Sequence, residues 1–206
     1  MKTQSKETQQ NLTPEQVLMM LKDGNKRFAK NLKANRNLQQ QVQETSEGQF
    51  PIATILSCMD SRTSAELIFD KGLGDIFSIR IAGNVLNDDI LGSMEFGTKA
   101  VGTKIILVLG HTKCGAVVGA CNDVKMGSLT QLLDKIKPAI NAEKEIAENR
   151  TGSNEAFVNS VTINNIHLVM DQIRKQSSII AEMESQGYVQ IAGGLYDVTS
   201  GEVTFY

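Results

Sequence analysis

Three short apolar segments stand out after the polar first fifty residues of the chain. They cover residues 52–57, 75–81 and 104–110 and are rich in β-branched side chains, which is typical of strands covered on both faces. Helical patterns separate these segments, notably over residues 88–101, where apolar positions form one stripe. Strands that alternate with helices predict right-handed crossovers and a parallel sheet.

The second half of the chain continues this pattern. Residues 129–149 and 157–176 are predicted to be amphipathic helices, and residues 188–196 with 201–206 are predicted to form a closing pair of strands. We therefore expect an α/β fold with a central, mainly parallel sheet flanked by helices.

An amphipathic helix is also predicted near the N-terminus. Thr13 is a suitable N-cap, Pro14 suits the first helical position, and Gln16 completes a capping box. The apolar side chains that follow at helical spacing are Val17, Leu18, Leu21 and Phe28. Residues 1–48 are thus predicted to form a helical arm on a domain of residues 49–206. The arm packs either on its own domain or across a partner subunit.

Composition excludes several classes of protein. The 206 residues are 41% hydrophobic, enough for a sizeable core, and the net charge of −2 offers no patch for nucleic acid. No apolar run reaches the roughly 18 residues of a membrane span, and the first residues lack the apolar stretch of a signal peptide. We expect a cytoplasmic protein, or a periplasmic one if a presequence was removed.

The positions of the few cysteines and histidines indicate a candidate metal site. Cys58 and His111 each follow an apolar strand, so both side chains should emerge at the carboxyl edge of a parallel sheet, and Cys114 lies three residues beyond His111. Two thiolates and an imidazole with one open position form a catalytic zinc site. The competing interpretation is two buried thiols and one loop histidine.

Asp60 and Arg62 follow Cys58 on the same turn. A carboxylate beside a guanidinium can form a bidentate pair. Asp60 could therefore bind zinc in the open position as a fourth ligand or, held by Arg62, accept the proton of zinc-bound water. Arg62 decides between the closed and the open site.

The paired motifs CMDSR at residues 58–62 and HTKCG at 111–115 resemble the zinc motifs of the β-class carbonic anhydrases. The resemblance extends from about Pro14 to the C-terminus and includes GNKRF at 24–28, GDIF at 74–77 and AGN at 82–84. It implies four parallel strands plus a C-terminal edge strand and one zinc ion per chain. It also implies a homodimer or homotetramer clasped by the N-terminal helices, with CO2 hydration to bicarbonate by zinc-bound hydroxide.

The same resemblance implies roles for individual residues. Cys58, His111 and Cys114 would hold zinc, and the Asp60–Arg62 pair would orient the metal-bound hydroxide. The substrate-binding positions would be Gln49, Phe77, Ala82 and the backbone N–H of Gly115.

The chain also departs from the family pattern, and other functions are compatible with its residues. Phe96 stands where many plant-type members carry tyrosine, and Ile55 stands where bicarbonate-regulated members have tryptophan, which argues against their inhibitory site. His167 lies in a helical pattern and Cys121 in a packed one, so we expect structural roles for both. The alternatives are a zinc hydrolase acting on CS2 or COS, and a binding module with structural zinc.

Overall fold

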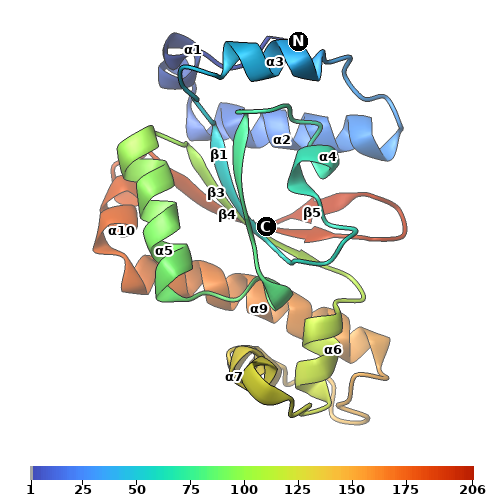
Figure 1. Cartoon of the computed structure of the whole chain (residues 1–206). Helices are drawn as coiled ribbons and strands as arrows, with labels where there is room; N and C mark the ends of the chain where they lie inside the picture. Colours follow the sequence, from blue (N-terminus) through green and yellow to red (C-terminus); the bar gives the residue numbers. More distant parts are fainter. Residues whose placement is uncertain (1) are drawn as a thin grey trace.

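A computed structural model describes residues 2–206 (Figure 1), and its centre is a five-stranded sheet in the order β2-β1-β3-β4-β5. The first four strands are parallel and the last is antiparallel to β4, which confirms the predicted fold. The strands are β1 (Ala53–Ser57), β2 (Ile76–Arg80), β3 (Ile105–His111), β4 (Gln190–Tyr196) and β5 (Val203–Phe205).

The register of the strands brings their carboxyl ends together. Ser57, the last residue of β1, pairs with Leu109 of β3 and with Arg80 of β2. The residues that follow β1 and β2 therefore emerge at the same edge as the end of β3. His111 is itself the last residue of β3 rather than the first residue after it.

β2 differs from the prediction that both of its faces are covered. It pairs only with β1; Ile76 is buried, Phe77 and Ile79 are partly buried, and Ser78 and Arg80 are exposed. An edge strand has a neighbouring strand on one side only, so β2 lacks the continuous burial of β1 and β3.

Helix α2 (Pro14–Ala29) lies over one face of the sheet, and the short α4 (Ala65–Ile68) lies beside it. The other two N-terminal helices, α1 (Lys6–Asn11) and α3 (Leu38–Glu44), lie near the amino ends of the strands. Val17 and Leu21 of α2 are fully buried in the same apolar cluster as Ile55 and Leu107 of the sheet. The apolar stripe of α2 thus packs on its own domain, while a contact with a second copy stays a prediction.

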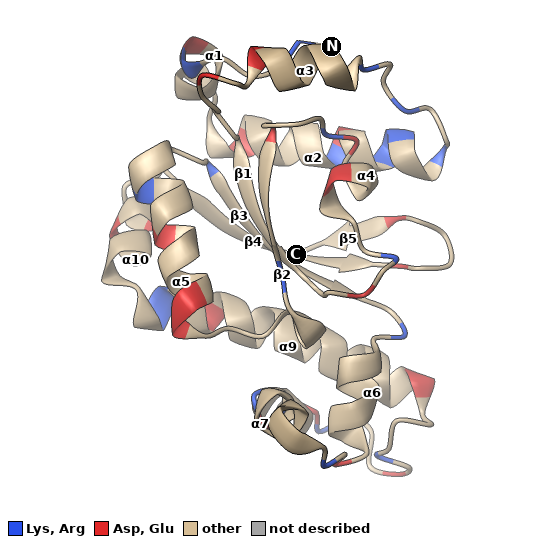
Figure 2. Ribbon diagram, in the orientation of Figure 1, with Lys and Arg blue, Asp and Glu red and all other residues tan. Residues whose placement is uncertain are grey.

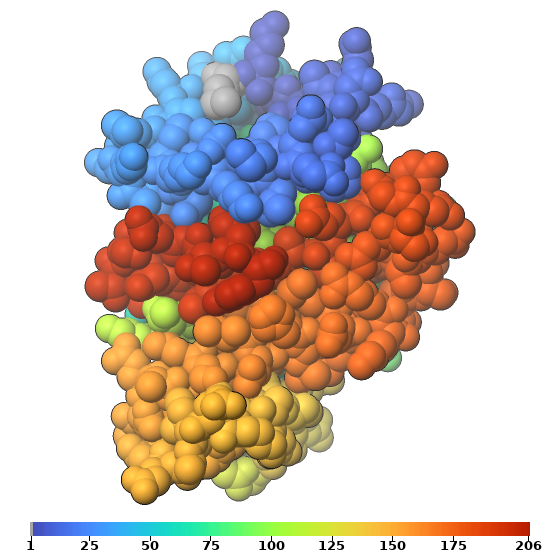
Figure 3. All heavy atoms as spheres, turned by 180° about the vertical axis from the view of Figure 1, so that it is seen from behind, coloured from blue at the N-terminus to red at the C-terminus, as the bar shows by residue number. Residues whose placement is uncertain are grey.

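Two contacts explain how closely α2 is attached. A Cβ on Gly24 would lie 1.9 Å from the carbonyl oxygen of Phe69, so only glycine permits this approach to the end of α4. The Asn25 amide donates to the Gly201 carbonyl and accepts from the Val203 N–H, at 2.9 and 2.8 Å. Figure 3 shows the resulting contact between the N-terminal helices and the C-terminal strands.

The opposite face is covered by helices from the middle and the end of the chain. These are α5 (Asp88–Glu95), its continuation as a π-helical turn η2 (Phe96–Val101), α9 (Glu155–Gln176) and α10 (Ser178–Ser185). The helix predicted over residues 88–101 is therefore present with a change of winding, and it ends where Gly102 adopts φ 95°.

A third apolar cluster lies beyond the carboxyl edge of the sheet. It joins the start of α9 to α6 (Gly115–Cys121), α7 (Gly127–Asp134) and α8 (Lys137–Ala142), and it includes Cys58 and Cys114. The prediction of one helix over residues 129–149 is wrong: α7 ends at Asp134, and Pro138 lies in the first turn of α8. Proline favours a first helical turn and interrupts a helix interior, which explains the break.

Charged residues of both signs occur in nearly equal numbers, 21 Lys and Arg against 23 Asp and Glu. Figure 2 shows Lys, Arg, Asp and Glu distributed over helices and loops, with few on the strands. Within residues 2–206, no helix is both long enough and apolar enough to cross a membrane.

Candidate metal centre

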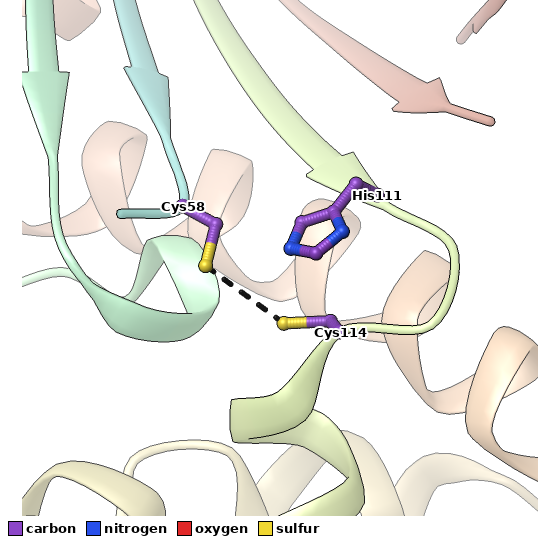
Figure 4. A group of neighbouring side chains, drawn as sticks. All are labelled: Cys58, His111 and Cys114. Carbon is purple, nitrogen blue, oxygen red and sulfur yellow. Dashed lines mark hydrogen bonds between the residues drawn. The ribbon is translucent and has the colours of Figure 1, made fainter. Parts of the chain in front are cut away.

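Three side chains converge at the carboxyl edge of the sheet (Figure 4). Cys58 follows β1, His111 ends β3, and Cys114 directly precedes α6. Their candidate ligand atoms lie within 4.8 Å of one another, and the two Sγ atoms are 3.9 Å apart. Tetrahedral zinc with Zn–S bonds of about 2.3 Å requires an S···S separation of roughly 3.8 Å, so the spacing fits this metal.

The histidine is set to offer one nitrogen. Its Nδ1 lies 2.9 Å from the Thr112 carbonyl oxygen, to which it can only donate, and this leaves Nε2 as the acceptor. Nε2 is buried without a hydrogen-bond partner among the described residues, and the side chain is 0% exposed. A buried acceptor that faces two thiols and has no partner of its own fits a metal ligand.

The two thiols influence each other. The hydrogen bond with Cys114 is the largest cause that lowers the pKa of Cys58, while the same neighbour and burial raise the pKa of Cys114. Two thiolates at 3.9 Å repel, so both ionise only when a cation lies between them. The donor set therefore suits a divalent cation with a preference for sulfur.

Asp60 is held in a bidentate pair by Arg62. The Arg62 Nε and Nη2 donate to the two carboxylate oxygens at 2.9 and 2.7 Å, and the Arg62 backbone N–H donates at 2.9 Å. These bonds lower the pKa of Asp60 well below its usual range. Asp60 Oδ2 still lies 4.0 Å from His111 Nε2, so the carboxylate borders the metal position.

Two residues that the sequence patterns did not single out hold this turn in place. Thr63, which is 0% exposed, donates from Oγ1 to the carbonyl oxygens of Cys58 and Asp60 at 2.8 and 2.9 Å. Arg80 donates to the same two oxygens, from Nε at 3.2 Å and from Nη2 at 2.5 Å. The one sequence signal that could have identified Arg80 was its charge near the end of a predicted strand. No sequence signal pointed to Thr63.

Ala82 and Gly115 lie next to the cluster, and their part in substrate binding stays a prediction. Ala82 begins the short turn η1 (Ala82–Asn84), and the N–H of the next residue, Gly83, donates to Cys58 Sγ at 3.3 Å. Gly115 is the first residue of α6, directly after Cys114, and is exposed.

Gln49 and Phe77 are not brought to the cluster within one chain. Gln49 precedes the amino end of β1 and borders an open pocket with Thr45 and Leu73, whereas Cys58 follows the carboxyl end, roughly 15 Å further along the strand. Phe77 pairs in register with Thr54, near the amino end of β1.

The remaining histidine and cysteine lie outside the cluster. His167 is exposed on α9, where its ring lies 5.2 Å from that of Tyr206. Cys121, the last residue of α6, is partly buried, and burial raises the pKa of its thiol to about 11. The structural roles expected for both residues stay predictions.

Comparisons with known proteins agree with this geometry. A family model described as carbonic anhydrase matches residues 53–203. The chain is 32% identical to carbonic anhydrase 2 of Mycobacterium tuberculosis over 93% of its own length and 92% of that protein.

Among solved structures, the β-carbonic anhydrase CafA of the fungus Aspergillus fumigatus matches with a TM-score of 0.70 at 23% identity, over 93% of this chain and 89% of that one. A tetrameric β-carbonic anhydrase of the ascomycete Sordaria macrospora matches with a TM-score of 0.68 at 21% identity, over 78% and 82%.

Proposed function

Because the chain belongs to the β-carbonic anhydrase family, whose members catalyse the hydration of CO2, we propose that it performs this reaction with one zinc ion on Cys58, His111 and Cys114. The observation that carries the proposal is the buried Nε2 of His111, which has no hydrogen-bond partner within residues 2–206 and faces two thiols 3.9 Å apart. A bound zinc ion would supply a water molecule whose pKa is lowered toward neutrality.

The Asp60–Arg62 pair then has a defined role. Arg62 donates to both carboxylate oxygens, so Asp60 is held as an anion beside the metal position and would have to leave this pair to bind the metal. An anion whose pKa is so low is a poor base but a good hydrogen-bond acceptor. Asp60 would therefore orient a metal-bound water rather than take up its proton, and its pairing with Arg62 counts against a fourth permanent ligand.

The substrate pocket requires a second copy of the chain. Ala82 and the N–H of Gly115 adjoin the cluster, but Gln49 and Phe77 lie toward the opposite end of β1. If these two residues bind CO2, they do so at the zinc of a partner subunit. We therefore propose a homodimer or a homotetramer, in keeping with the tetrameric relative of Sordaria macrospora.

A reducing compartment such as the cytoplasm suits this site. Cys58 and Cys114 lie 3.9 Å apart, and oxidation to a disulfide would remove two of the three ligands.

Stopped-flow CO2 hydration tests the proposal, on protein whose zinc content is measured and beside the variants Cys58→Ala and Asp60→Asn. We expect one zinc per chain and activity that rises with pH in the unchanged protein. Cys58→Ala should lose zinc and activity together. Asp60→Asn should retain zinc and lose about a hundredfold in kcat, within the range of a residue that orients a reacting group.

The controls separate the alternatives. Cys121→Ala removes a thiol outside the cluster and should change neither zinc content nor rate. Zinc-loaded protein without CO2 hydration would contradict the proposal, and turnover of CS2 or COS by that protein would favour the hydrolase instead.

A further inference from the structure

Asn165 is an unusual residue for its position on α9. It is 1% exposed and lies in the buried stripe of the helix beside Ile166, where apolar side chains are the rule. Its Oδ1 is buried without a hydrogen-bond partner among the described residues. Burying an amide that is only half satisfied lowers stability, so packing alone does not account for asparagine here.

The other polar atom of this amide, Nδ2, is hydrogen-bonded, and its bond connects α9 to the metal centre. Asn165 Nδ2 donates to the carbonyl oxygen of Gly83 at 2.9 Å. The N–H of Gly83 in turn donates to Cys58 Sγ at 3.3 Å. One residue of η1 thus accepts from α9 on its carbonyl side and donates to a candidate zinc ligand on its amide side.

Gly83 needs such an anchor because its backbone has few restraints of its own. It adopts φ 66°, and a Cβ would lie 2.8 Å from Ile136 Cδ1 and 3.2 Å from the Ala116 Cβ, so a side chain does not fit. Glycine in this conformation is free to rotate unless its polar groups are held. The bond from Asn165 holds the peptide unit between Gly83 and Asn84. This limits rotation about the Gly83 backbone, whose N–H lies in the preceding peptide unit and donates to Cys58 Sγ.

We propose that Asn165 is a positioning residue for the zinc ligand Cys58, acting through Gly83. The proposal rests on the zinc site of the proposed function. An N–H that points at a thiolate stabilises its charge and fixes its orientation, and outer partners of metal ligands commonly change metal affinity 10- to 100-fold. Asn165 acts one step further out, so we expect an effect near the lower end of this range.

The test compares Asn165→Leu and Asn165→Ser with the unchanged protein. Leucine keeps most of the volume without the donor, and serine is too short to reach Gly83. Zinc release to a chromophoric chelator should be about tenfold faster in both variants. After replacement of zinc by Co2+, the thiolate-to-cobalt charge-transfer absorption should shift. If the leucine variant does not fold, the serine variant still tests the proposal.

Two controls identify a purely structural effect. Asn164→Ala removes the neighbouring amide, whose bond goes to the Ala139 carbonyl, away from the cluster. Val169→Ala weakens the same buried stripe of α9 without touching η1. Both should leave zinc release and the cobalt spectrum unchanged while lowering thermal stability.

The outcomes are distinguishable from failure of the proposed function. If the unchanged protein bound no zinc, the proposed zinc site itself would be contradicted. Protein that binds zinc normally, with release rates in the Asn165 variants equal to those of Val169→Ala, would overturn the role of Asn165 and leave the anhydrase proposal standing.

Discussion

At the scale of single residues, the metal centre depends on donors that hold the backbone of the turn after β1. Arg80 and Thr63 both donate to the carbonyl oxygens of Cys58 and Asp60. These bonds fix two peptide units, and through them the direction of one candidate ligand and of the carboxylate beside it. Neither donor needs to touch the substrate for its loss to change the rate.

We predict that Arg80→Leu lowers kcat for CO2 hydration about tenfold or more while one zinc per chain is retained. A hydrogen bond from a charged donor is worth about 1.5–3 kcal/mol, and each 1.4 kcal/mol corresponds to a factor of ten. Stopped-flow rates with metal analysis provide the measurement. Ser78→Ala is the matched control, since Ser78 is exposed on the same strand and its hydroxyl donates to Glu66. Equal rates in the two variants would show that Arg80 has no such role.

At the scale of elements, a buried ion pair attaches the N-terminal arm to the sheet domain. Asp70, which is 4% exposed, accepts from Arg27 Nε at 2.6 Å, from Arg36 Nη1 and from the Ala34 N–H. Burial by itself raises the pKa of Asp70, but the bonds from Arg27 and Arg36 outweigh it, and the net pKa is lowered. The carboxylate thus ties α2 and the loop before α3 to the end of α4.

We predict that Asp70→Asn lowers the free energy of unfolding at pH 7 by about 3 kcal/mol, as for a buried pair that loses one partner. The carboxyl of the unfolded chain titrates near pH 4, and the folded pKa is lower. The ionised form therefore stabilises the folded state above about pH 4, and this contribution is lost as the pH falls through the folded pKa.

Denaturant unfolding of both proteins at pH 7, 5 and 3.5, with the same metal content, measures this effect. The difference between them should shrink at the lowest pH. Asp23→Asn is a suitable control, because Asp23 forms an exposed pair with Lys26. A difference that stays constant with pH would contradict the role of the Asp70 charge.

At the scale of the whole molecule, exposed apolar side chains surround the open edge of the sheet at β2. They are carried by α3, α4, the loop before β2 and η2, and they are Leu38, Val42, Leu67, Leu73 and Phe96. The Phe96 ring is 58% exposed and lies 6.4 Å from that of Phe77. This surface, which we call the β2-edge surface, suits burial against a second copy of the chain.

We predict that Phe96→Arg dissociates the oligomer and abolishes CO2 hydration while each chain retains its zinc. A buried charge at an apolar interface is costly, and each site would then lack the partner's Gln49 and Phe77. Light scattering during size-exclusion chromatography, with metal analysis, measures both properties. Tyr188→Glu, at a residue 60% exposed and before β4, is the control. A fully active monomer would refute the shared site.

The local patterns of the chain were sufficient for most of the fold and for the metal ligands. Strand and helix periods depend on neighbours within a few residues, and the carboxyl ends of parallel strands meet at one edge, so Cys58 and His111 could be placed together before any contact was known. The prediction of one helix over residues 129–149 was wrong because it relied on the amphipathic spacing and gave too little weight to Pro138, a local signal of a break.

Tertiary structure alone decided the features that depend on distant contacts. Asn165 meets Gly83 across 82 positions, and Arg80 meets Cys58 across 22, and no periodicity predicts such pairs. The same holds for Gln49: the resemblance implied that it binds the substrate, yet β1 separates it from Cys58 within one chain. Each residue of an extended strand adds about 3.3 Å, so Gln49 and Cys58 lie far apart although few residues separate them. Packing has the opposite effect on Asn25, which contacts Gly201 and Val203 near the other end of the chain.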